Sequence, residues 1–532
     1  RHREEAVAGG ELSIRRFFAY LMLFGSLVVA ALGLSGLLGA ALSNAAARTT
    51  ADIAVPLALT ITGLPVFAAL ALWTSRSLRT EPAERRTVGW GVYLNAALLT
   101  SLGFTVGSAF AVAGAAVQGD WEGFGAAMLA VWGAAWAGHW VVWTRVRPEV
   151  LTRLHIWIAS TAGLWIGAVS AGLTIDALLQ RMINPGLGAP SSAGWDELWI
   201  ALCGVGIGGA VWAWHWLAHG LHAPHTEGWH GYVLLAGVAA GLVAAVAGAG
   251  YALYLVLEWL VGDPGAATAR QQFADVSPAV GACAVGLASW RYHRAVVGPS
   301  AWRDRTEVDR IYDYLVAGIA LVTMAVATSI LVIALFEALT PIAAGASNTL
   351  VAAATLLAVG VPMWTVTWRR VQRLAGKDPA ERLSITRRVY LFVVFGVGGM
   401  VAFGAAVSVL VAVFEALFEG STAAALAGAV DLPVALLITA GGGAFYHWLV
   451  YRTEHHEAMA ARRREILLVA DGIDVADIAR RANVRIRLLH RTDLPAGSTL
   501  DADAVVAAIG QTEGDHLMVL AEPGDVRVVP FE

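Results

Sequence analysis

The sequence has few of the residues on which disulfide frameworks, cysteine metal clusters and charged binding surfaces depend. Its two cysteines, Cys203 and Cys283, each lie within an apolar run, which excludes a disulfide framework and a zinc site held by four cysteines. Lys377 is the single lysine, and charged residues make up only 14% of the chain. The sequence contains no P-loop, HExxH or Ser/His/Asp pattern, and its arginines are too scattered for nucleic-acid binding. No catalytic residue and no cofactor is therefore indicated.

Long apolar runs dominate the chain instead. Hydrophobic residues make up 58% of the 532 residues, more than the core of a soluble protein can bury. A helix of about 20 apolar residues crosses a bilayer. Twelve runs of that order are present, at 17–42, 53–73, 88–117, 123–143, 154–179, 198–217, 232–257, 277–292, 311–335, 350–368, 389–417 and 432–451. We therefore predict an all-α polytopic membrane protein with about twelve transmembrane helices.

The segments 309–339 and 387–417 follow one pattern. Each opens with arginine and tyrosine, continues as an apolar run and ends in Phe-Glu-Ala-Leu. A second apolar run ending in aromatic residues and arginine follows each copy, and the other spans pair in a related way. An internal repeat of roughly 70 to 80 residues explains this pattern. It predicts a transmembrane domain over 17–452 made of six two-helix hairpins, at 17–80, 87–147, 153–220, 230–294, 310–373 and 387–452.

Basic residues are concentrated on one side of the predicted spans. The N-terminal segment and the loops between pairs carry 23 Lys and Arg, against three in the loops within pairs. By the positive-inside rule we expect both termini, including segment 1–16, in the cytoplasm of a bacterium, with the spans in its plasma (inner) membrane. Because each repeat has an even number of spans, the six repeats are expected to run parallel. The chain opens at Arg1 rather than at a methionine, which leaves open what precedes it.

Small residues recur at helical spacing in the first helix of several pairs. Such positions let helix backbones approach closely in lipid, where dispersion packing drives association. We therefore predict tightly packed first helices at three glycine pairs: Gly103 and Gly107, Gly163 and Gly167, Gly237 and Gly241.

The composition changes after Tyr451. Segment 453–465 is charged and predicts a juxtamembrane linker beside anionic headgroups. Segment 466–532 alternates short strand patterns at 466–470, 484–489, 517–521 and 526–529 with helix patterns at 475–482 and 502–509. It predicts a small cytoplasmic α/β domain with an exposed strand edge, to which a protein partner has access.

Four acidic residues lie near the outer ends of the first helices in the last four pairs. Ionisable groups at membrane depth are costly and often mark ion or proton paths. The opposing interpretation is that the three glutamates lie at the outer interface, where water is available; one acid lies about a turn deeper. The candidates for a ligand or ion pathway are Asp176, the deepest, with Glu258, Glu337 and Glu415.

Histidines gather at the end of the sixth span, beside the loop between pairs that lacks arginine. His215, His219 and His222 follow one another at helical spacing, which suits imidazole ligands to zinc or an axial ligand to haem. Against this, His139, His293 and His447 lie beside aromatic residues at comparable span ends, a pattern typical of anchoring at the membrane interface. Both interpretations stay open on the sequence.

The fourth span carries a stripe of tryptophans. Trp132, Trp136 and Trp140 follow one another at a spacing of four, so they share one face of a helix. Such an aromatic face suits a quinone, a pigment or an acyl chain, and it equally suits packing against neighbouring helices and lipid.

The repeat resembles the uncharacterised bacterial membrane family catalogued as domain of unknown function 5671. The resemblance rests on an arginine shortly before a tyrosine, at Arg310 and Tyr312 and again at Arg388 and Tyr390, and on spans that end in Trp and His before arginine. It extends over most of 15–452 and not over the tail. It implies a helical membrane domain, and it implies no activity, cofactor or ligand residue.

Three functions are compatible with these patterns. The leading hypothesis is a non-catalytic membrane scaffold or sensor that contacts membrane lipids through its spans and a protein partner through the cytoplasmic domain. The second is a carrier or channel for a small molecule or ion that uses carboxylates such as Asp176. The third is a redox or quinone-associated subunit that uses the His and Trp clusters. The oligomeric state is not indicated by the sequence.

Overall fold

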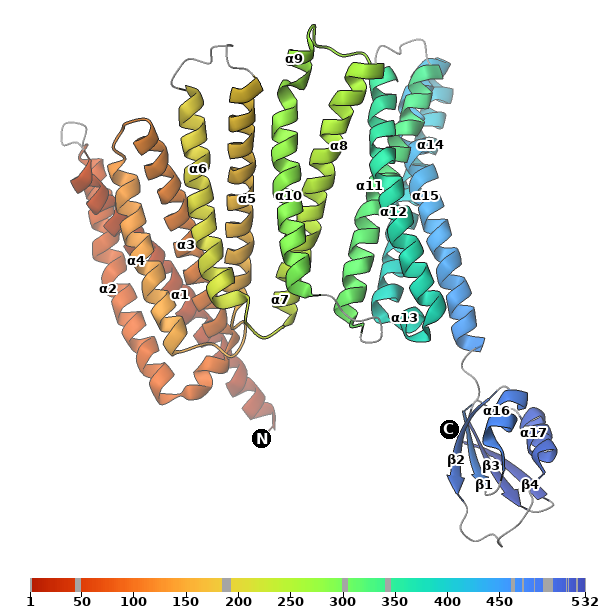
Figure 1. Ribbon diagram of the computed structural model, residues 1–532. Helices are drawn as coiled ribbons and strands as arrows, with labels where there is room; N and C mark the ends of the chain where they lie inside the picture. The colour runs from red at the N-terminus through yellow and green to blue at the C-terminus, as the bar shows by residue number, and fades with distance from the viewer. Residues whose placement is uncertain are drawn as a thin grey trace. The chain divides into compact units, whose positions relative to one another are not determined.

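The computed structural model describes residues 2–43, 49–183, 193–298, 305–339 and 346–460, and in the C-terminal part 465–470, 473–482, 484–490, 501–512, 514, 516–522 and 525–531. Within these residues twelve helical segments are long and apolar enough to cross a membrane, as predicted. Their main helices, coloured along the chain in Figure 1, are α1 (His2–Leu42), α2 (Ala51–Thr80), α3 (Val88–Val117), α4 (Gly123–Arg145), α5 (Leu154–Ile183), α6 (Ala193–Trp212), α8 (Ala240–Val261), α10 (Val276–Val297), α11 (Glu307–Leu339), α12 (Ala346–Lys377), α14 (Ile385–Glu419) and α15 (Ala423–Ala460).

Shorter elements connect or extend these helices. Two π-helical segments extend crossings: η3 (Ala213–Gly220) continues α6, and η4 (Tyr232–Ala239) precedes α8. The remaining elements are η2 (Pro82–Arg86), α7 (Glu227–Gly231), α9 (Ala269–Gln272), η5 (Phe273–Asp275) and α13 (Pro379–Leu383). The chain divides into two compact units, Arg1–Arg369 with Phe418–Ala435, and Arg370–Leu417 with Leu436–Glu532.

Local capping sets the limits of α3 and α4. In lipid only a helix or a closed barrel pairs every backbone group internally, so these long apolar runs become helices. The side chain of Thr87 accepts a hydrogen bond from the Trp90 amide and caps α3, and Glu122 caps α4 through the Gly125 amide. Between them Gly119 has a φ of 79°, a left-handed conformation that glycine adopts without steric cost. The two helices therefore form a tight hairpin.

In the first unit, long helices that follow one another along the chain pack together: α1 on α2, α3 on α4, α5 on α6 and α8 on α10. The α5–α6 contact depends on glycine, because a Cβ atom at Gly163 would lie 2.5 Å from the Trp212 amide nitrogen. Close packing is likewise observed at Gly167, Gly237 and Gly241, as predicted. The prediction is wrong for Gly103 and Gly107, because no atom of the described residues lies within 4 Å of a Cβ placed there.

Ion pairs fix the chain at the basic ends of the helices. In the first unit Glu84 of η2 is buried; it accepts a hydrogen bond of 2.8 Å from the Tyr20 hydroxyl and lies 2.9 Å from Nε of Arg16. In the second unit the buried Arg387 donates from Nε to Glu454 at 2.8 Å and from a terminal nitrogen to Gln372 at 2.6 Å. Each buried charge thus has a charged partner, as a low-dielectric site requires.

The C-terminal part is a small α/β domain, as predicted. Its elements are β1 (Glu465–Ala470), α16 (Val475–Ala482), β2 (Arg485–His490), α17 (Ala502–Gln511), β3 (His516–Glu522) and β4 (Asp525–Pro530). The strand order is β2-β1-β3-β4; β1 pairs in parallel with β2 and β3, and β3 pairs antiparallel with β4. The turn predicted between β3 and β4 at 523–524 lies outside the described residues.

Alternation along the strands builds the core of this domain. Ile466, Leu468 and Ala470 of β1 are fully buried, together with residues of both helices and β3. Because successive strand side chains point to opposite faces, Leu467 and Val469 lie on the other face and are only half-buried. The domain therefore has a hydrophobic core of its own.

On the surface of this domain, outside the spans, hydrogen bonds to Asp503 and Asp477 raise the pKa of Arg481.

Candidate ligand pocket among the first four helices

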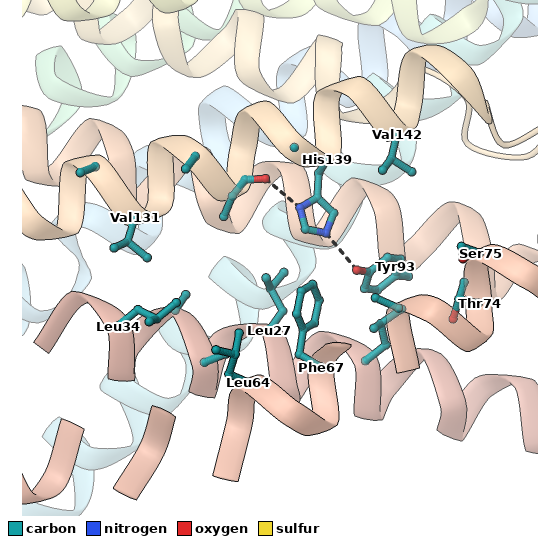
Figure 2. Close-up of a pocket in the computed structure, with 18 of the residues that line it drawn as sticks. Leu27, Leu34, Leu64, Phe67, Thr74, Ser75, Tyr93, Val131, His139 and Val142 are labelled. Atoms are coloured by element: carbon teal, nitrogen blue, oxygen red, sulfur yellow. Dashed lines mark hydrogen bonds between the residues drawn. The ribbon is translucent and has the colours of Figure 1, made fainter. Parts of the chain in front are cut away.

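A cavity of about 710 Å³ lies among α1, α2, α3 and α4, which are side by side in the first unit (Figure 1). This volume is in the range of small-molecule and cofactor sites. Most of its lining is apolar, from residues such as Leu27 and Leu34 of α1 and Leu64 and Phe67 of α2, as Figure 2 shows. The polar or amphipathic side chains of the lining are Thr74, Ser75, Trp90, Tyr93 and His139.

Small residues on one face of α4 make room for this cavity. Ala130, Ala134 and Gly138 recur every four residues and all line it, so they share one side of the helix. A Cβ atom at Gly138 would find no atom of the described residues within 4 Å. Ala71 of α2 contributes a further small side chain to the lining. The pocket thus exists because this face of α4 lacks bulk.

Two of the polar groups form a hydrogen-bonded pair at one end of the pocket. The Tyr93 hydroxyl lies 2.9 Å from Nε2 of His139, and Nδ1 of His139 lies 2.8 Å from the carbonyl oxygen of Ala135 (Figure 2). The Tyr93 ring packs against Tyr20, at 5.9 Å, and against Trp90, at 5.7 Å, and these two rings also meet each other, at 6.0 Å. Trp90 in turn donates its indole N–H to the carbonyl of Val146 at 3.3 Å. Packing and hydrogen bonds therefore hold the Tyr93–His139 pair in one arrangement.

This polar end lies toward the arginine-rich ends of the four helices. Tyr93 is in the second turn of α3, and Thr74 and His139 are in the last two turns of α2 and α4. The loops that join these ends carry most of the arginines of the region. The opposite end is aliphatic and includes Leu34, Leu38 and Val131. The cavity is therefore polar at one membrane face and apolar along the rest of its length.

The tryptophan stripe lies on another face of α4. Trp132 is fully buried and stacks on Phe104 with a centroid separation of 4.3 Å. Trp136 and Trp140 meet the ring of Trp214 at 6.0 and 5.6 Å. None of the three tryptophans is among the described residues that line the cavity. The structure thus brings this stripe together with α3 and η3, and the pocket uses the small-residue face that the sequence analysis did not select.

Two of the three candidate histidines at the sixth span pack against a tryptophan. Trp140 lies with its ring 5.6 Å from His215 and 4.8 Å from His219, while His222 is exposed. Nδ1 of His215 bonds to the carbonyl of Val211 at 2.8 Å, and Nδ1 of His219 bonds to that of Trp214 at 2.7 Å. The second bond reaches five residues back, the span of the π-helical turn in η3. Among the described residues, no group of three or more His, Cys, Asp or Glu is placed to hold a metal ion.

The acidic candidates lie outside the cavity. Asp176 accepts a 2.5 Å hydrogen bond from Ser277 of α10. Glu258 accepts hydrogen bonds from Tyr254 at 2.7 Å and from Gln272 at 2.6 Å. In the second pair of acids, Glu337 is half-buried and Glu415 is exposed. Asp176 and Glu258 thus take part in hydrogen-bond networks at helix ends, and none of the four carboxylates is among the described residues of the pocket lining.

Sequence reasoning placed His139 at a span end and did not pair it with Tyr93. The two residues are 46 positions apart, on different helices of one hairpin. The available signal was the run of small residues at Ala130, Ala134 and Gly138 on the side of α4 away from the tryptophans. That signal indicates a helix face with small side chains. Whether such a face packs closely against another helix or borders a cavity depends on the helices next to it.

Comparison with known proteins identifies two segments of the chain. No curated protein and no solved structure matches it. The family model described as domain of unknown function (DUF5671) matches residues 16–123 and residues 310–442. The match is narrower than the stretch 15–452 expected from the repeat, and its first segment includes all the pocket residues of α1, α2 and α3. Residues 16–123 and 310–442 of this chain are therefore similar to the DUF5671 family.

Proposed function

We propose that this multi-pass membrane protein is a non-catalytic sensor or scaffold that holds the hydrocarbon chain of a membrane lipid in the pocket among α1 to α4. In this proposal it resides in a bacterial plasma membrane, its parallel hairpins form the scaffold, and both termini are cytoplasmic. The distribution of arginine between the two sets of loops supports that orientation.

The observation that carries the proposal is the apolar cavity itself. Its lining consists of aliphatic and aromatic side chains with polar groups gathered at one end. A cavity of this kind gives water few hydrogen-bond partners along its length, and the surrounding medium of a membrane protein is lipid. The occupant best suited to it is a hydrocarbon chain with a small polar head.

Selectivity in such a site comes from shape and from the polar end. Transfer of a chain from lipid into an apolar pocket removes little apolar surface from water, so the hydrophobic effect contributes little. Dispersion contacts in a fitted cavity and hydrogen bonds to the head distinguish one lipid from the bulk. This suits a sensor, which binds one lipid class among many.

The C-terminal domain is the proposed contact for a protein partner. Strands β2 and β4 are the two edges of the described sheet, and edge strands present unpaired backbone groups to a partner. Leu489 of β2 and Val529 of β4 are exposed, at 43% and 38%. Both lie on the face of the sheet that carries Leu467, away from the core with α16 and α17.

Photo-crosslinking in the membrane tests the pocket. Cells are fed a fatty acid that carries a diazirine along its chain, so that the crosslinker enters their lipids. After illumination the modified peptides of the purified chain are mapped by mass spectrometry. We expect the crosslinks to concentrate on α1 to α4, at lining residues such as Leu27 and Phe67.

A variant whose pocket is filled by larger side chains is compared with the wild-type chain and with a control variant. Ala134→Phe with Gly138→Leu places bulk in the cavity, whereas Ala137→Leu adds bulk at an exposed neighbouring position of α4 outside the lining. The double variant should lose most of the crosslinks on α1 to α4, and Ala137→Leu should keep them. Equal labelling of all three proteins would show that the labelled chains lie on the outer surface of the helices, and would refute the proposal.

A further inference from the structure

The arrangement of hydrogens at the polar end limits which lipid fits. We infer that the pocket takes a neutral amphiphile whose head is a hydrogen-bond donor, namely a long-chain alcohol of the isoprenoid kind, in preference to an ether, an ester or an acid. This inference rests on the proposed function, because it assigns the head group of the chain held by the same pocket.

The direction of the Tyr93–His139 hydrogen bond follows from its neighbours. The carbonyl oxygen of Ala135 only accepts, so Nδ1 of His139, 2.8 Å away, carries the hydrogen. In a neutral imidazole the other nitrogen, Nε2, is then an acceptor. The Tyr93 hydroxyl, 2.9 Å from Nε2, must donate to it. Tyr93 therefore has no hydrogen left for a ligand and offers only the lone pairs of its oxygen.

Most of the other polar groups of the lining also donate their hydrogen to a group of the protein. The indole N–H of Trp90 donates to Val146, and the hydroxyl of Ser75 donates to the carbonyl of Leu72 at 2.8 Å. Thr74 carries the remaining hydroxyl of the lining, which both donates and accepts. Tyr93 and Thr74 lie at the same end of the pocket (Figure 2). A ligand hydroxyl satisfies both, because it donates to Tyr93 and accepts from Thr74.

Charge selects against an anionic head. The described residues that line the cavity include no Lys, Arg, Asp or Glu. The nearby Arg16 is paired with Glu84, at 2.9 Å, and with Glu81, at 3.3 Å. A carboxylate or phosphate held inside the cavity would therefore meet no cationic side chain among the described lining residues, and an uncompensated charge within the membrane is costly. A neutral head avoids that cost.

The length of the pocket favours a long chain. Its lining on α1 runs from Leu23 to Leu38, which corresponds to about 22 Å along a helix axis. Half of a bilayer's hydrocarbon core measures only about 15 Å. A chain that fills the pocket thus reaches past the bilayer midplane, which favours a long and extended chain. A long isoprenoid alcohol has both this reach and a hydroxyl head.

Competition binding tests the head group. The purified full chain, in nanodiscs with a diazirine-labelled long-chain alcohol as the crosslinker, is titrated with geranylgeraniol, its methyl ether and geranylgeranoic acid. The ether keeps an oxygen that accepts from Thr74 and loses the hydrogen donated to Tyr93. We expect the alcohol to displace the crosslinker at roughly five- to tenfold lower concentration than the ether, the effect of one neutral hydrogen bond. The acid should bind more weakly than either.

Two variants separate the roles of the polar residues. Tyr93→Phe alone would expose Nε2 of His139 as a substitute acceptor, so the decisive variant is Tyr93→Phe with His139→Leu. It should abolish the difference between alcohol and ether, while Thr74→Val should weaken both equally. The control is Tyr232→Phe with His293→Leu, a like pair whose oxygen and nitrogen are 3.1 Å apart and whose residues do not line the pocket.

The possible failures are distinguishable. Equal affinity of the alcohol and the ether for the wild-type chain would overturn the head-group assignment while leaving the pocket occupied. Tighter binding of the acid would do the same. Absence of crosslinks on α1 to α4 in the wild-type chain, before any competitor is added, would instead refute the proposed function on which the assignment rests.

Discussion

The Tyr232 hydroxyl lies 3.1 Å from Nε2 of His293, which reproduces in the second half of the first unit the 2.9 Å contact between Tyr93 and His139. In both pairs the tyrosine is near the start of one crossing and the histidine near the end of the next. Nδ1 of each histidine bonds to the carbonyl four residues earlier, that of Ser289 in one case and Ala135 in the other. The pair thus joins two helices of a hairpin at one membrane face.

A ring contact between the same residue types lies in the second unit. The rings of Tyr390 and His447 are 5.8 Å apart, and Nδ1 of His447 again bonds four residues back, to Gly443 at 2.7 Å. Two hairpins thus join their ends through a hydrogen bond between tyrosine and histidine, and in a third the same two residue types meet through their rings. This recurrence supports the repeat inferred from the sequence, although common descent of the six pairs stays a prediction.

A glycine is required beside the ring of His293, in the Tyr232–His293 pair. A Cβ atom at Gly237 would overlap the His293 ring, whereas one at Gly231 would meet no atom of the described residues within 4 Å. We predict that Gly237→Ala lowers the thermal unfolding temperature of the detergent-purified chain by several degrees, because overpacking costs about 1–3 kcal/mol. Gly231→Ala should change it far less. If both variants melted alike, the ring would not be fixed against η4.

The Tyr232 hydroxyl also accepts from the indole of Trp212 at 2.7 Å. Tyr232→Phe should therefore destabilise the protein by about 1–3 kcal/mol, because it leaves buried polar groups without a partner. Tyr251→Phe, at a tyrosine that is 45% exposed, is the control and should be nearly neutral. Thermal unfolding followed by tryptophan fluorescence measures both, and a larger loss for Tyr251→Phe would contradict the network.

The ion pair of Arg387 and Glu454 gives a second stability prediction. Arg387 is fully buried and Glu454 is 19% exposed. Glu454→Leu leaves a buried charge without its carboxylate and should cost about 3–5 kcal/mol, whereas the double change with Arg387→Met should restore much of that loss. The exposed pair of Arg480 and Asp477 provides the control: Asp477→Asn should have little effect. Failure of the double variant to recover stability would indicate that Arg387 acts through Gln372 instead.

Cysteine labelling tests the proposed orientation. In a chain whose two cysteines are replaced by alanine, Thr226→Cys marks a loop between pairs and Ala267→Cys marks a loop within a pair. Both positions are exposed. In intact cells a membrane-impermeant maleimide should label Ala267→Cys alone, and Thr226→Cys should react only after permeabilisation. The reverse pattern would place the termini outside the cell.

The C-terminal domain should unfold independently of its neighbours. Leu468 is fully buried in its core, whereas Leu489 is 43% exposed. Leu468→Ala should cost about 2–5 kcal/mol and make the segment after residue 465 sensitive to protease, while the transmembrane fragment stays resistant. Leu489→Ala should leave protease resistance unchanged. Loss of the transmembrane fragment in the first variant would show that the two parts fold as one.

The sequence by itself determined the crossings and the elements of the C-terminal domain. Both depend on local quantities: the length of an apolar run, which must match the bilayer, and the alternation of residues such as Ile466 and Leu467, which separates the two faces of a strand. The run 17–42 was sufficient to predict a crossing, and α1 contains it.

Only the tertiary structure decided which helix faces meet. Trp140 and His139 are neighbours in the sequence, yet one packs against Trp214 and the other bonds to Tyr93 beside the pocket. Gly163 and Gly103 look alike in the sequence, yet only Gly163 lies against another backbone. The reason is physical: the rotation of each helix about its axis is set by all of its neighbours together, so the space between α1 and α4 is a property of four helices and is encoded in no single one.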